Sequence, residues 1–168
     1  PRIQQLKKSK VNLVLLTRAA GTPVITYGAD LCGMAPAHLA SAQSAIAKAV
    51  APEAGGKSSS AVLYVADGAN GTLDPGFDAT ILAMRMWSLA HWQRWIPHGS
   101  LADSFAGAQN KVVIKAPSEA QSSTDAVARS SVQIAWRKVT GPVTTLVSSL
   151  ARLQWIAKSA RTFVTDVG

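Results

Sequence analysis

The segment Gly56-Lys57-Ser58 comes nearest to a catalytic motif in this sequence. A phosphate-binding loop reads G-x-x-x-x-G-K-[ST], follows a strand and opens a helix. Here Ala51 stands where the first glycine belongs, and the preceding residues have the composition of a helix. We therefore interpret the segment as a surface loop with one lysine, and a nucleotide-binding enzyme is the least favoured hypothesis.

Acidic residues occur in two further places where chemistry is conceivable. Tyr64-Val65-Ala66-Asp67 resembles the Y-x-D-D metal-binding turn of reverse transcriptases, but Ala66 replaces the first aspartate. Two-metal polymerisation needs carboxylates that hold both ions, so this segment is not expected to be an active site. Asp74 and Asp78 lie one turn apart at the start of an expected helix, where carboxylates cap the helix and interact favourably with its dipole.

Histidine and cysteine form no constellation either. His38, His91 and His98 lack metal-ligand spacing, and Cys32 is the single cysteine, which excludes an intramolecular disulfide. We expect Cys32 to be a small buried apolar residue. These residues predict no catalytic residue, no metal site and no cofactor, so we expect that the chain is not an enzyme. A single cysteine suits a reducing intracellular compartment, with the nucleus or an organelle as candidates.

Charge is the strongest functional signal. The 168 residues include 17 lysines and arginines against 9 aspartates and glutamates, a net charge of +8. The positive residues gather at the two ends of the chain, and this arrangement predicts contact with a polyanion, most often nucleic acid. An acidic protein surface is the alternative partner, and a basic surface that only keeps the protein soluble is the third interpretation. The expected contacts are Arg2, Lys7, Lys8, Lys10, Arg137, Lys138, Arg152, Lys158 and Arg161.

The chain is organised around the stretch Leu73–Pro97, which predicts one helix over about residues 74–96. Asp74 is a candidate N-cap, and Pro97 cannot continue a helix. Apolar residues cover most of its circumference, which is typical of a helix that is buried on several sides. A stripe of small residues on one side would let another helix approach closely; it consists of Ala79, Ala83 and Ala90.

This helix also contains three of the five tryptophans, Trp87, Trp92 and Trp95. One interpretation makes the tryptophans a platform on which nucleic-acid bases stack, with His91 as a ligand or base. The other makes them core residues and leaves His91 partly exposed. We favour the second interpretation, and we therefore expect Trp92→Ala to unfold the domain at a cost of about 3–5 kcal/mol.

Periodicity, caps and turn residues predict the remaining elements. Two short segments are compatible with helix or strand, namely Ala61–Ala66 and Lys111–Lys115, and Arg161–Val167 could pair as a strand. The polar stretch Ala116–Thr124 is the best candidate for a linker. Helices are expected over Arg2–Ala20 with Gly21 as C-cap, Val24–Leu31 with Thr22 as N-cap, Pro36–Val50, Leu101–Asn110, Asp125–Val139 and Pro142–Leu153.

The expected fold is mainly α, a single helical domain around the tryptophan-rich helix with little strand. Residues 1–115 would form a helical core, 116–124 a polar linker, and 125–168 a C-terminal helical segment that packs on the core. The 48% hydrophobic content suffices for a core, and no stretch of 18 apolar residues predicts a transmembrane segment. Because the chain begins with Pro1, we expect that it has lost its initiator or been cut from a longer precursor, and no signal peptide is visible.

Several short words of the sequence resemble a known family. They include R-A-A-G-T-P at 18–23, Y-G-A-D-L-C-G-M at 27–34, L-D-P-G-F-D-A at 73–79, W-S-L-A-H-W at 87–92 and the closing F-V-T-D-x-G. From Arg2 to Gly168 the chain resembles the region downstream of the polymerase domain in non-LTR (LINE-type) retroelement reverse-transcriptase polyproteins of dinoflagellate-type genomes. The resemblance implies a helical thumb or connector that helps to hold template and primer. The catalytic motifs of the palm do not occur in the sequence.

Two hypotheses follow from charge and resemblance together. The first is a non-catalytic, basic helical module of reverse-transcriptase-like origin that binds nucleic acid through phosphate contacts. The second is a structural accessory subunit of a larger protein assembly, for example an organellar one, whose basic ends dock on an acidic protein or a membrane surface.

Overall fold

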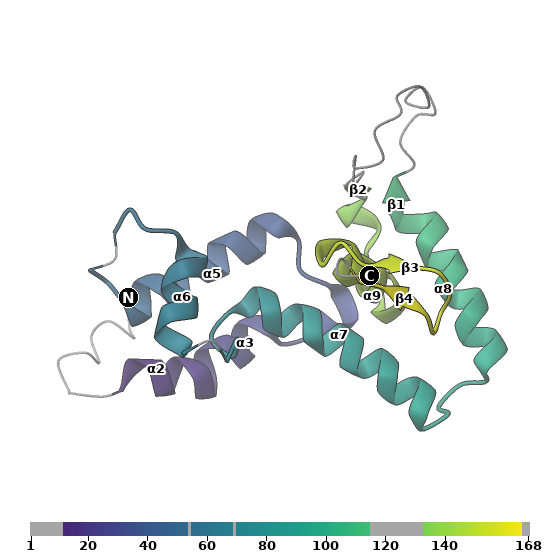
Figure 1. Cartoon of the computed structure of the whole chain (residues 1–168), viewed down its shortest axis with the longest axis horizontal. Helices are drawn as coiled ribbons and strands as arrows, with labels where there is room; N and C mark the ends of the chain where they lie inside the picture. Colours follow the sequence, from purple (N-terminus) through teal and green to yellow (C-terminus); the bar gives the residue numbers. More distant parts are fainter. Residues whose placement is uncertain (1–11, 54, 69, 115–132, 166–168) are drawn as a thin grey trace. The chain divides into compact units, whose positions relative to one another are not determined.

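The computed structural model describes residues 12–53, 55–68, 70–114 and 133–165 (Figure 1). The described chain is mainly helical with four strands of two residues each, which confirms the predicted fold class. It divides into two compact units: unit 1 comprises Pro1–Ala29 and Met34–Leu82, and unit 2 comprises Asp30–Gly33 and Ala83–Gly168. The border between them falls within the longest helix, and also within the short α4 (Ala29–Cys32). The predicted linker 116–124 lies outside the described residues, so the division placed there stays a prediction.

Unit 1 is built around a pair of helices, α5 and α6, that pack against each other (Figure 1). The cluster at this contact buries Ile46, Ala47, Leu63 and Leu73. The partly buried side chains around it are Val14, Ile25, Val50, Val62 and Ala66. The elements are α2 (Leu13–Leu16), the π turn η2 (Thr17–Gly21), α3 (Thr22–Thr26), α5 (Pro36–Val50), α6 (Ser59–Asp67) and the first half of α7 (Pro75–Trp92). The prediction for Pro36–Val50 is confirmed, and the open choice for Ala61–Ala66 resolves as helix.

The helix predicted over Arg2–Ala20 differs from the structure in its described part, because Asn12 has extended backbone (φ −69°, ψ 97°) and caps a helix that begins at Leu13, while residues 2–11 lie outside the described part. We predicted that this helix ends at the C-cap Gly21, but it continues past that residue. Helical backbone continues through the π turn into α3, and Thr22 has helical angles (φ −63°, ψ −50°) instead of an N-cap conformation. The π turn widens the helix immediately before Pro23, which has no N–H to donate to a regular ladder. The helix stops at Tyr27-Gly28, where Gly28 adopts a φ of +76°. The predicted helix Val24–Leu31 is therefore interrupted at Tyr27-Gly28, and its last three residues belong to the separate helix α4 (Ala29–Cys32).

Helix α7 ends at Trp92, four residues before the predicted end. Arg94 adopts a left-handed φ of +52°, and the Trp95 N–H bonds back to the Ala90 carbonyl at 3.2 Å. This is the geometry of a Schellman motif, in which a left-handed residue turns the chain away from the helix axis. The helix is thus stopped by its own C-terminal turn before Pro97 is reached.

The buried side of α7 is the alanine stripe, and the tryptophan-rich side is mostly exposed. Ala79 and Ala83 are 3% and 2% exposed, whereas Trp92 is 87% exposed and Trp95 about half exposed. The prediction that Trp92 and Trp95 belong to the core is wrong, and only Trp87 is buried. A helix that is apolar nearly all round does not specify which side is buried, and small residues permit the closest approach of neighbouring backbone.

Unit 2 joins two small antiparallel ribbons to helices. Strand β1 pairs with β2 in the register Val113↔Ile134, and β3 pairs with β4 in the register Ile156↔Val164. Its elements are the second half of α7, α8 (His98–Val112), β1 (Val113–Ile114), β2 (Gln133–Ile134), the 3₁₀ turn η4 (Trp136–Lys138), α9 (Pro142–Arg152), β3 (Ile156–Ala157) and β4 (Phe163–Val164).

Three predictions for unit 2 meet different outcomes. The helix expected over Asp125–Val139 is wrong for its described part, because residues 133–134 form β2 and residues 136–138 form η4. Between them, the Ala135 N–H donates to the Val112 carbonyl at the end of α8 at 2.8 Å. Residues 125–132 lie outside the described part. The strand expected near the C-terminus is confirmed as β4. Helix α8 starts two residues before the predicted Ser100 cap, with Leu101 and Phe105 buried as expected.

Helix α9 is the most deeply buried element of unit 2. All residues from Thr144 to Leu150 are buried, and the helix packs on α8, β2 and β3. Its polar side chains have local partners: the Thr144 hydroxyl accepts the Thr140 and Gly141 N–H groups at 3.0 Å, and Ser148 donates to the Thr145 carbonyl. We predicted that α7 is the central buried helix, but in unit 2 the central buried helix is α9. Within the described residues, no helix is long and apolar enough to cross a membrane.

Candidate nucleic-acid interface

Positive charge is concentrated in unit 2. Its described part carries eight arginines and lysines against two aspartates, Asp30 and Asp103. Of the predicted phosphate contacts, Arg2, Lys7, Lys8 and Lys10 lie outside the described residues. The other five all belong to unit 2, and four of them are exposed: Arg137, Lys138, Lys158 and Arg161. The structure therefore gathers the C-terminal half of the predicted set on one compact unit.

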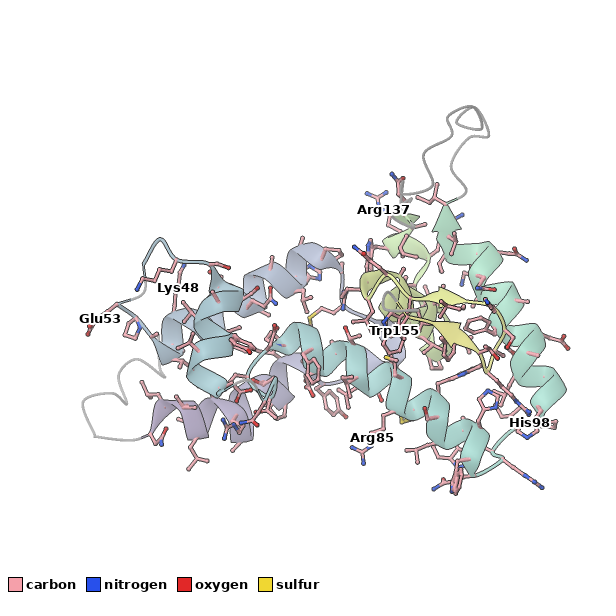
Figure 2. All side chains as sticks on the ribbon, in the orientation of Figure 1. Lys48, Glu53, Arg85, His98, Arg137 and Trp155 are labelled. Carbon is pink, nitrogen blue, oxygen red and sulfur yellow. The ribbon has the colours of Figure 1, made fainter. Side chains whose placement is uncertain are left out.

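One group of cations lies near the C-terminal end of α8. Arg137 and Lys138 belong to η4, which follows β2, and β2 pairs with β1, the strand that comes directly after α8 (Figure 2). Lys111, which the charge pattern did not single out, lies close by, since its ammonium donates to the Thr140 hydroxyl at 2.9 Å. The four cations of this group, which we call the η4 group, are Lys111, Arg137, Lys138 and Arg152.

Arg152 differs from the rest of this group. Its guanidinium carbon lies 5.2 Å from the centroid of the Trp136 ring, a cation–π geometry, and the side chain is only partly exposed. Burial lowers the pKa of the Arg152 guanidinium, which nevertheless stays charged at neutral pH. Arg152 therefore adds positive charge to the group from a partly buried position. Arg137 and Lys138 are exposed, so a phosphate can contact them directly.

A second cationic site lies at the N-terminal end of α8, about 22 Å away along this 15-residue helix. The β3–β4 hairpin meets the end of α7 here, because the Trp87 indole N–H donates to the Ala160 carbonyl at 2.9 Å. These two elements and the start of α8 border an open pocket of about 350 Å³. It is lined by Trp87, Ser88, His91, Trp92, His98, Ala160, Arg161 and Phe163. We call it the hairpin pocket.

Aromatic rings form most of the wall of the hairpin pocket. His91 and His98 are stacked at 5.4 Å between ring centroids with planes 15° apart, and the Trp87 ring meets His91 edge-on at 4.9 Å. Figure 2 shows His98 at the start of α8. These rings come from α7 and α8, which are joined by the turn that follows Arg94. The early end of α7 is therefore what creates the pocket.

His91 is the buried polar group of this pocket. Neither of its ring nitrogens has a hydrogen-bond partner among the described residues, and both are shielded from solvent. Burial lowers the pKa of His91 below its ordinary value, and the nearby charges of Arg161 and His98 lower it further. The imidazole is thus neutral at pH 7 and lies beside a guanidinium, so the pocket combines flat π surfaces, one permanent cation and unused hydrogen-bonding atoms.

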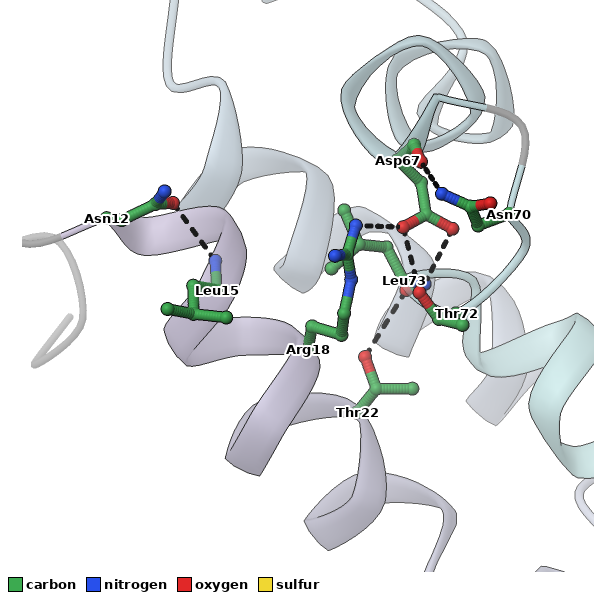
Figure 3. Close-up of polar contacts among 8 residues, drawn as sticks. All are labelled: Asn12, Leu15, Arg18, Thr22, Asp67, Asn70, Thr72 and Leu73. Atoms are coloured by element: carbon green, nitrogen blue, oxygen red, sulfur yellow. Dashed lines mark hydrogen bonds and ion pairs between the residues drawn. The ribbon is translucent and has the colours of Figure 1, made fainter.

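The buried aspartate of unit 1, Asp67, stabilises the fold. Asp67 is 3% exposed and pairs with Arg18 at 2.7 Å (Figure 3). Its carboxylate also accepts the Thr72 hydroxyl at 2.9 Å and the Leu73 N–H at 3.3 Å. Burial alone would raise the pKa of Asp67, but these hydrogen bonds outweigh it and hold the pKa below its ordinary value of 3.8. Asp67, the carboxylate of the Y-x-D-D-like segment, therefore has all its bonds within the fold. The sequence did not predict that Arg18 is one of its partners.

The P-loop-like segment lies beside a pocket of about 400 Å³ whose lining includes Lys48, Gly56 and Lys57. The element before it is α5, a helix, where a phosphate-binding loop requires a strand. No group of three or more histidine, cysteine or acidic side chains suitable for a metal ion occurs within the described residues. Cys32, which we expected to be buried, is exposed.

One pattern in the sequence indicates the hairpin pocket, although our interpretation of the tryptophans as core residues did not use it. The words W-S-L-A-H-W and I-P-H place Trp92, His91 and His98 within eight residues, around an arginine and a proline that can form a turn. The pairing of Trp87 with the distant Ala160 carbonyl had no signal in the sequence. No protein-family model matches the chain, and neither a curated protein nor a solved structure matches it significantly.

Proposed function

We propose that this protein is a non-catalytic module that binds nucleic acid through phosphate contacts made by unit 2. The observation that supports it is the segregation of charge: eight cations against two aspartates in the described part of unit 2, with the four exposed predicted contacts among them. Lysines and arginines that neutralise phosphates release condensed counterions, which provides a large share of binding free energy without base recognition. A reverse-transcriptase-like origin is part of the proposal and rests on the sequence resemblance alone.

Salt dependence of binding tests the proposal directly. If the exposed residues Arg137, Lys138, Lys158 and Arg161 each contact a phosphate, the logarithm of the binding constant for a single strand should fall with the logarithm of salt concentration with a slope of about −3. Affinity would then drop by about 60-fold between 50 and 200 mM salt. Fluorescence anisotropy of a labelled oligonucleotide measures this, and the absence of binding, or binding that ignores salt, would reject the proposal.

A matched pair of double variants locates the charge that matters. Arg137→Gln with Lys138→Gln removes two cations from unit 2, and Lys48→Gln with Lys57→Gln removes two exposed cations from unit 1. We expect the first pair to reduce the slope by about 1.4 and the second to leave it unchanged. Equal effects of the two pairs would mean that net charge, and not unit 2, governs binding.

A structural subunit of a larger assembly is the second candidate. It is favoured by apolar side chains on the surface of unit 1: Val24, Tyr27, Tyr64 and Val65 are all more than 60% exposed. Large contiguous apolar patches mark protein-interaction surfaces, so this candidate requires that these four side chains form one patch. Purification of the protein from its native source after nuclease treatment separates the two candidates, because a stoichiometric protein complex would survive the treatment and a nucleic-acid complex would not.

A further inference from the structure

We infer that the hairpin pocket of unit 2 takes one unpaired base of a single-stranded nucleic acid, which stacks on Trp92 while Arg161 contacts a neighbouring phosphate. The inference rests on the proposed function and deepens it, because phosphate contacts alone do not distinguish single strands from duplexes. It concerns residues that belong to unit 2 throughout, and none of them is part of the η4 group.

The first support is the exposure of Trp92. Its indole is 87% exposed at the rim of the pocket, although burial of a tryptophan side chain stabilises a protein more than burial of most other side chains. Trp92 is the last residue of α7, and the left-handed Arg94 turns the chain away directly after it. One face of the indole therefore stays open, and an open aromatic face next to a cation is the arrangement on which bases stack in single-strand-binding proteins.

The second support is the unused polar capacity of the pocket wall. Both ring nitrogens of His91 are shielded from water and have no partner within the described residues. More than nine tenths of buried polar groups in folded proteins have such a partner, so a ligand that turns the His91 ring towards the pocket would give its nitrogens one. Ser88 lies one residue from Trp87 in the same lining, and its hydroxyl donates to the Met84 carbonyl, which leaves its oxygen able to accept. The edge of a base carries donors and acceptors for both side chains.

The third support is the match of size and charge. A volume of about 350 Å³ lies within the range of small-molecule sites, roughly 300–1,000 Å³. Arg161 lines the pocket and is exposed on the turn of the β3–β4 hairpin, where its backbone N–H is fixed by the Ser159 hydroxyl at 3.2 Å. The η4 group at the other end of α8 would hold the same strand further along its backbone. A single strand can satisfy both sites, since its bases are free to leave the stack.

The test compares ligands and variants with the full chain. The ligands are single-stranded RNA and DNA of one sequence and about 12 nucleotides, a common site size, the duplex, and a single strand without bases. Wild type should bind the single strands at least about tenfold more tightly than the duplex or the abasic strand, since stacking of one base contributes about 1–3 kcal/mol. Equal affinity for the strand with bases and the strand without them would overturn the inference.

Trp92→Ala should lower affinity for the single strand by about tenfold. It should leave unchanged both the affinity for the abasic strand and the slope of the logarithm of the binding constant against the logarithm of salt concentration. Trp92→Phe should keep most of the affinity, because it retains a π face. Trp95→Ala is the matched control, since Trp95 is an exposed tryptophan three residues further on that does not line the pocket. An equal loss with Trp95→Ala would place the stacking elsewhere.

Arg161→Gln should reduce the salt slope by about 0.7, and it should do so on the abasic strand too. Circular dichroism of each variant shows whether it is folded, and Trp92→Phe keeps the test decisive if Trp92→Ala is not. Salt-dependent binding that Trp92→Ala leaves unchanged would refute the pocket and leave the proposed function standing. No binding of any strand would refute both.

Discussion

The two units of this protein use charge in opposite ways. The described part of unit 1 holds four acidic residues against three cations, and its most buried carboxylate, Asp67, is enclosed by Arg18, Thr72 and the Leu73 backbone. The described part of unit 2 holds eight cations against two aspartates, and most of the cations are open to solvent. Charge stabilises structure in unit 1 and remains accessible to a ligand in unit 2.

The same contrast extends to the way each unit is held together. The apolar cluster of unit 1 joins four buried residues, and it is supplemented by polar contacts such as the Thr22 hydroxyl on the Leu73 carbonyl. Unit 2 has a larger apolar core around α9, with Trp87, Phe105 and Leu146 among its members. The exposed cations of unit 2 and the exposed Trp92 lie outside this core.

The largest expected effect comes from the core of unit 2. Leu146→Ala removes most of a side chain that is 1% exposed on α9, and we expect a loss of about 3 kcal/mol in the free energy of unfolding, from lost burial and the cavity that remains. Urea unfolding followed by circular dichroism measures it. Trp92→Ala serves as the comparison, with an expected change within about 0.5 kcal/mol, the range of exposed positions. If Trp92→Ala cost as much as Leu146→Ala, α7 would be the central helix after all.

This pair of variants also marks where sequence patterns stop being informative. The pattern of α9, with Leu146, Val147 and Leu150 at helical spacing, predicts a helix with these residues inward, and the structure confirms both the helix and their burial, although the threonines and serines between them are buried as well. The pattern of α7 is apolar on nearly all sides, so it predicts a helix without specifying its buried side. That choice was made by the small volume of Ala79 and Ala83, which a count of hydrophobic residues undervalues.

The candidate site shows the same limit in another form. The five cations predicted in the C-terminal half, all of which lie in unit 2, followed from charge alone, since charge patterns need no knowledge of the fold. The hairpin pocket did not follow, because it depends on a contact between Trp87 and Ala160, which lie 73 positions apart, and on the left-handed turn at Arg94. A non-glycine residue in that conformation has no reliable local signature.

The next largest expected loss of stability comes from the buried carboxylate of Asp67, and it tests the role of charge in unit 1. Asp67→Asn removes the negative charge that faces Arg18 but keeps the size of the side chain. We expect a loss of about 2–3 kcal/mol, towards the lower end for a broken buried ion pair, because Arg18 is 39% exposed and can turn to water. Native-state hydrogen exchange should show the loss of protection within unit 1. Asp103→Asn, the same change at an exposed carboxylate of unit 2, should cost less than about 0.5 kcal/mol; similar losses in both variants would remove the distinction between the units.

Acidification gives the smallest effect and separates the units by pH. A folded-state pKa below the unfolded value means that the unfolded chain binds more protons, so stability falls as pH falls, by at most about 1.4 kcal/mol per pH unit for one group. For His91 in unit 2 this loss begins below pH 6.5, and for Asp67 in unit 1 it begins only below pH 3.8. Thermal unfolding between pH 7.5 and 5 should therefore weaken unit 2 first. His91→Phe, which replaces the unpartnered imidazole with an apolar ring, should flatten this slope and leave the loss below pH 3.8 unchanged. If the stability of His91→Phe still fell between pH 7.5 and 5, another group would be responsible for the titration, and His91 would not explain the pH dependence of unit 2.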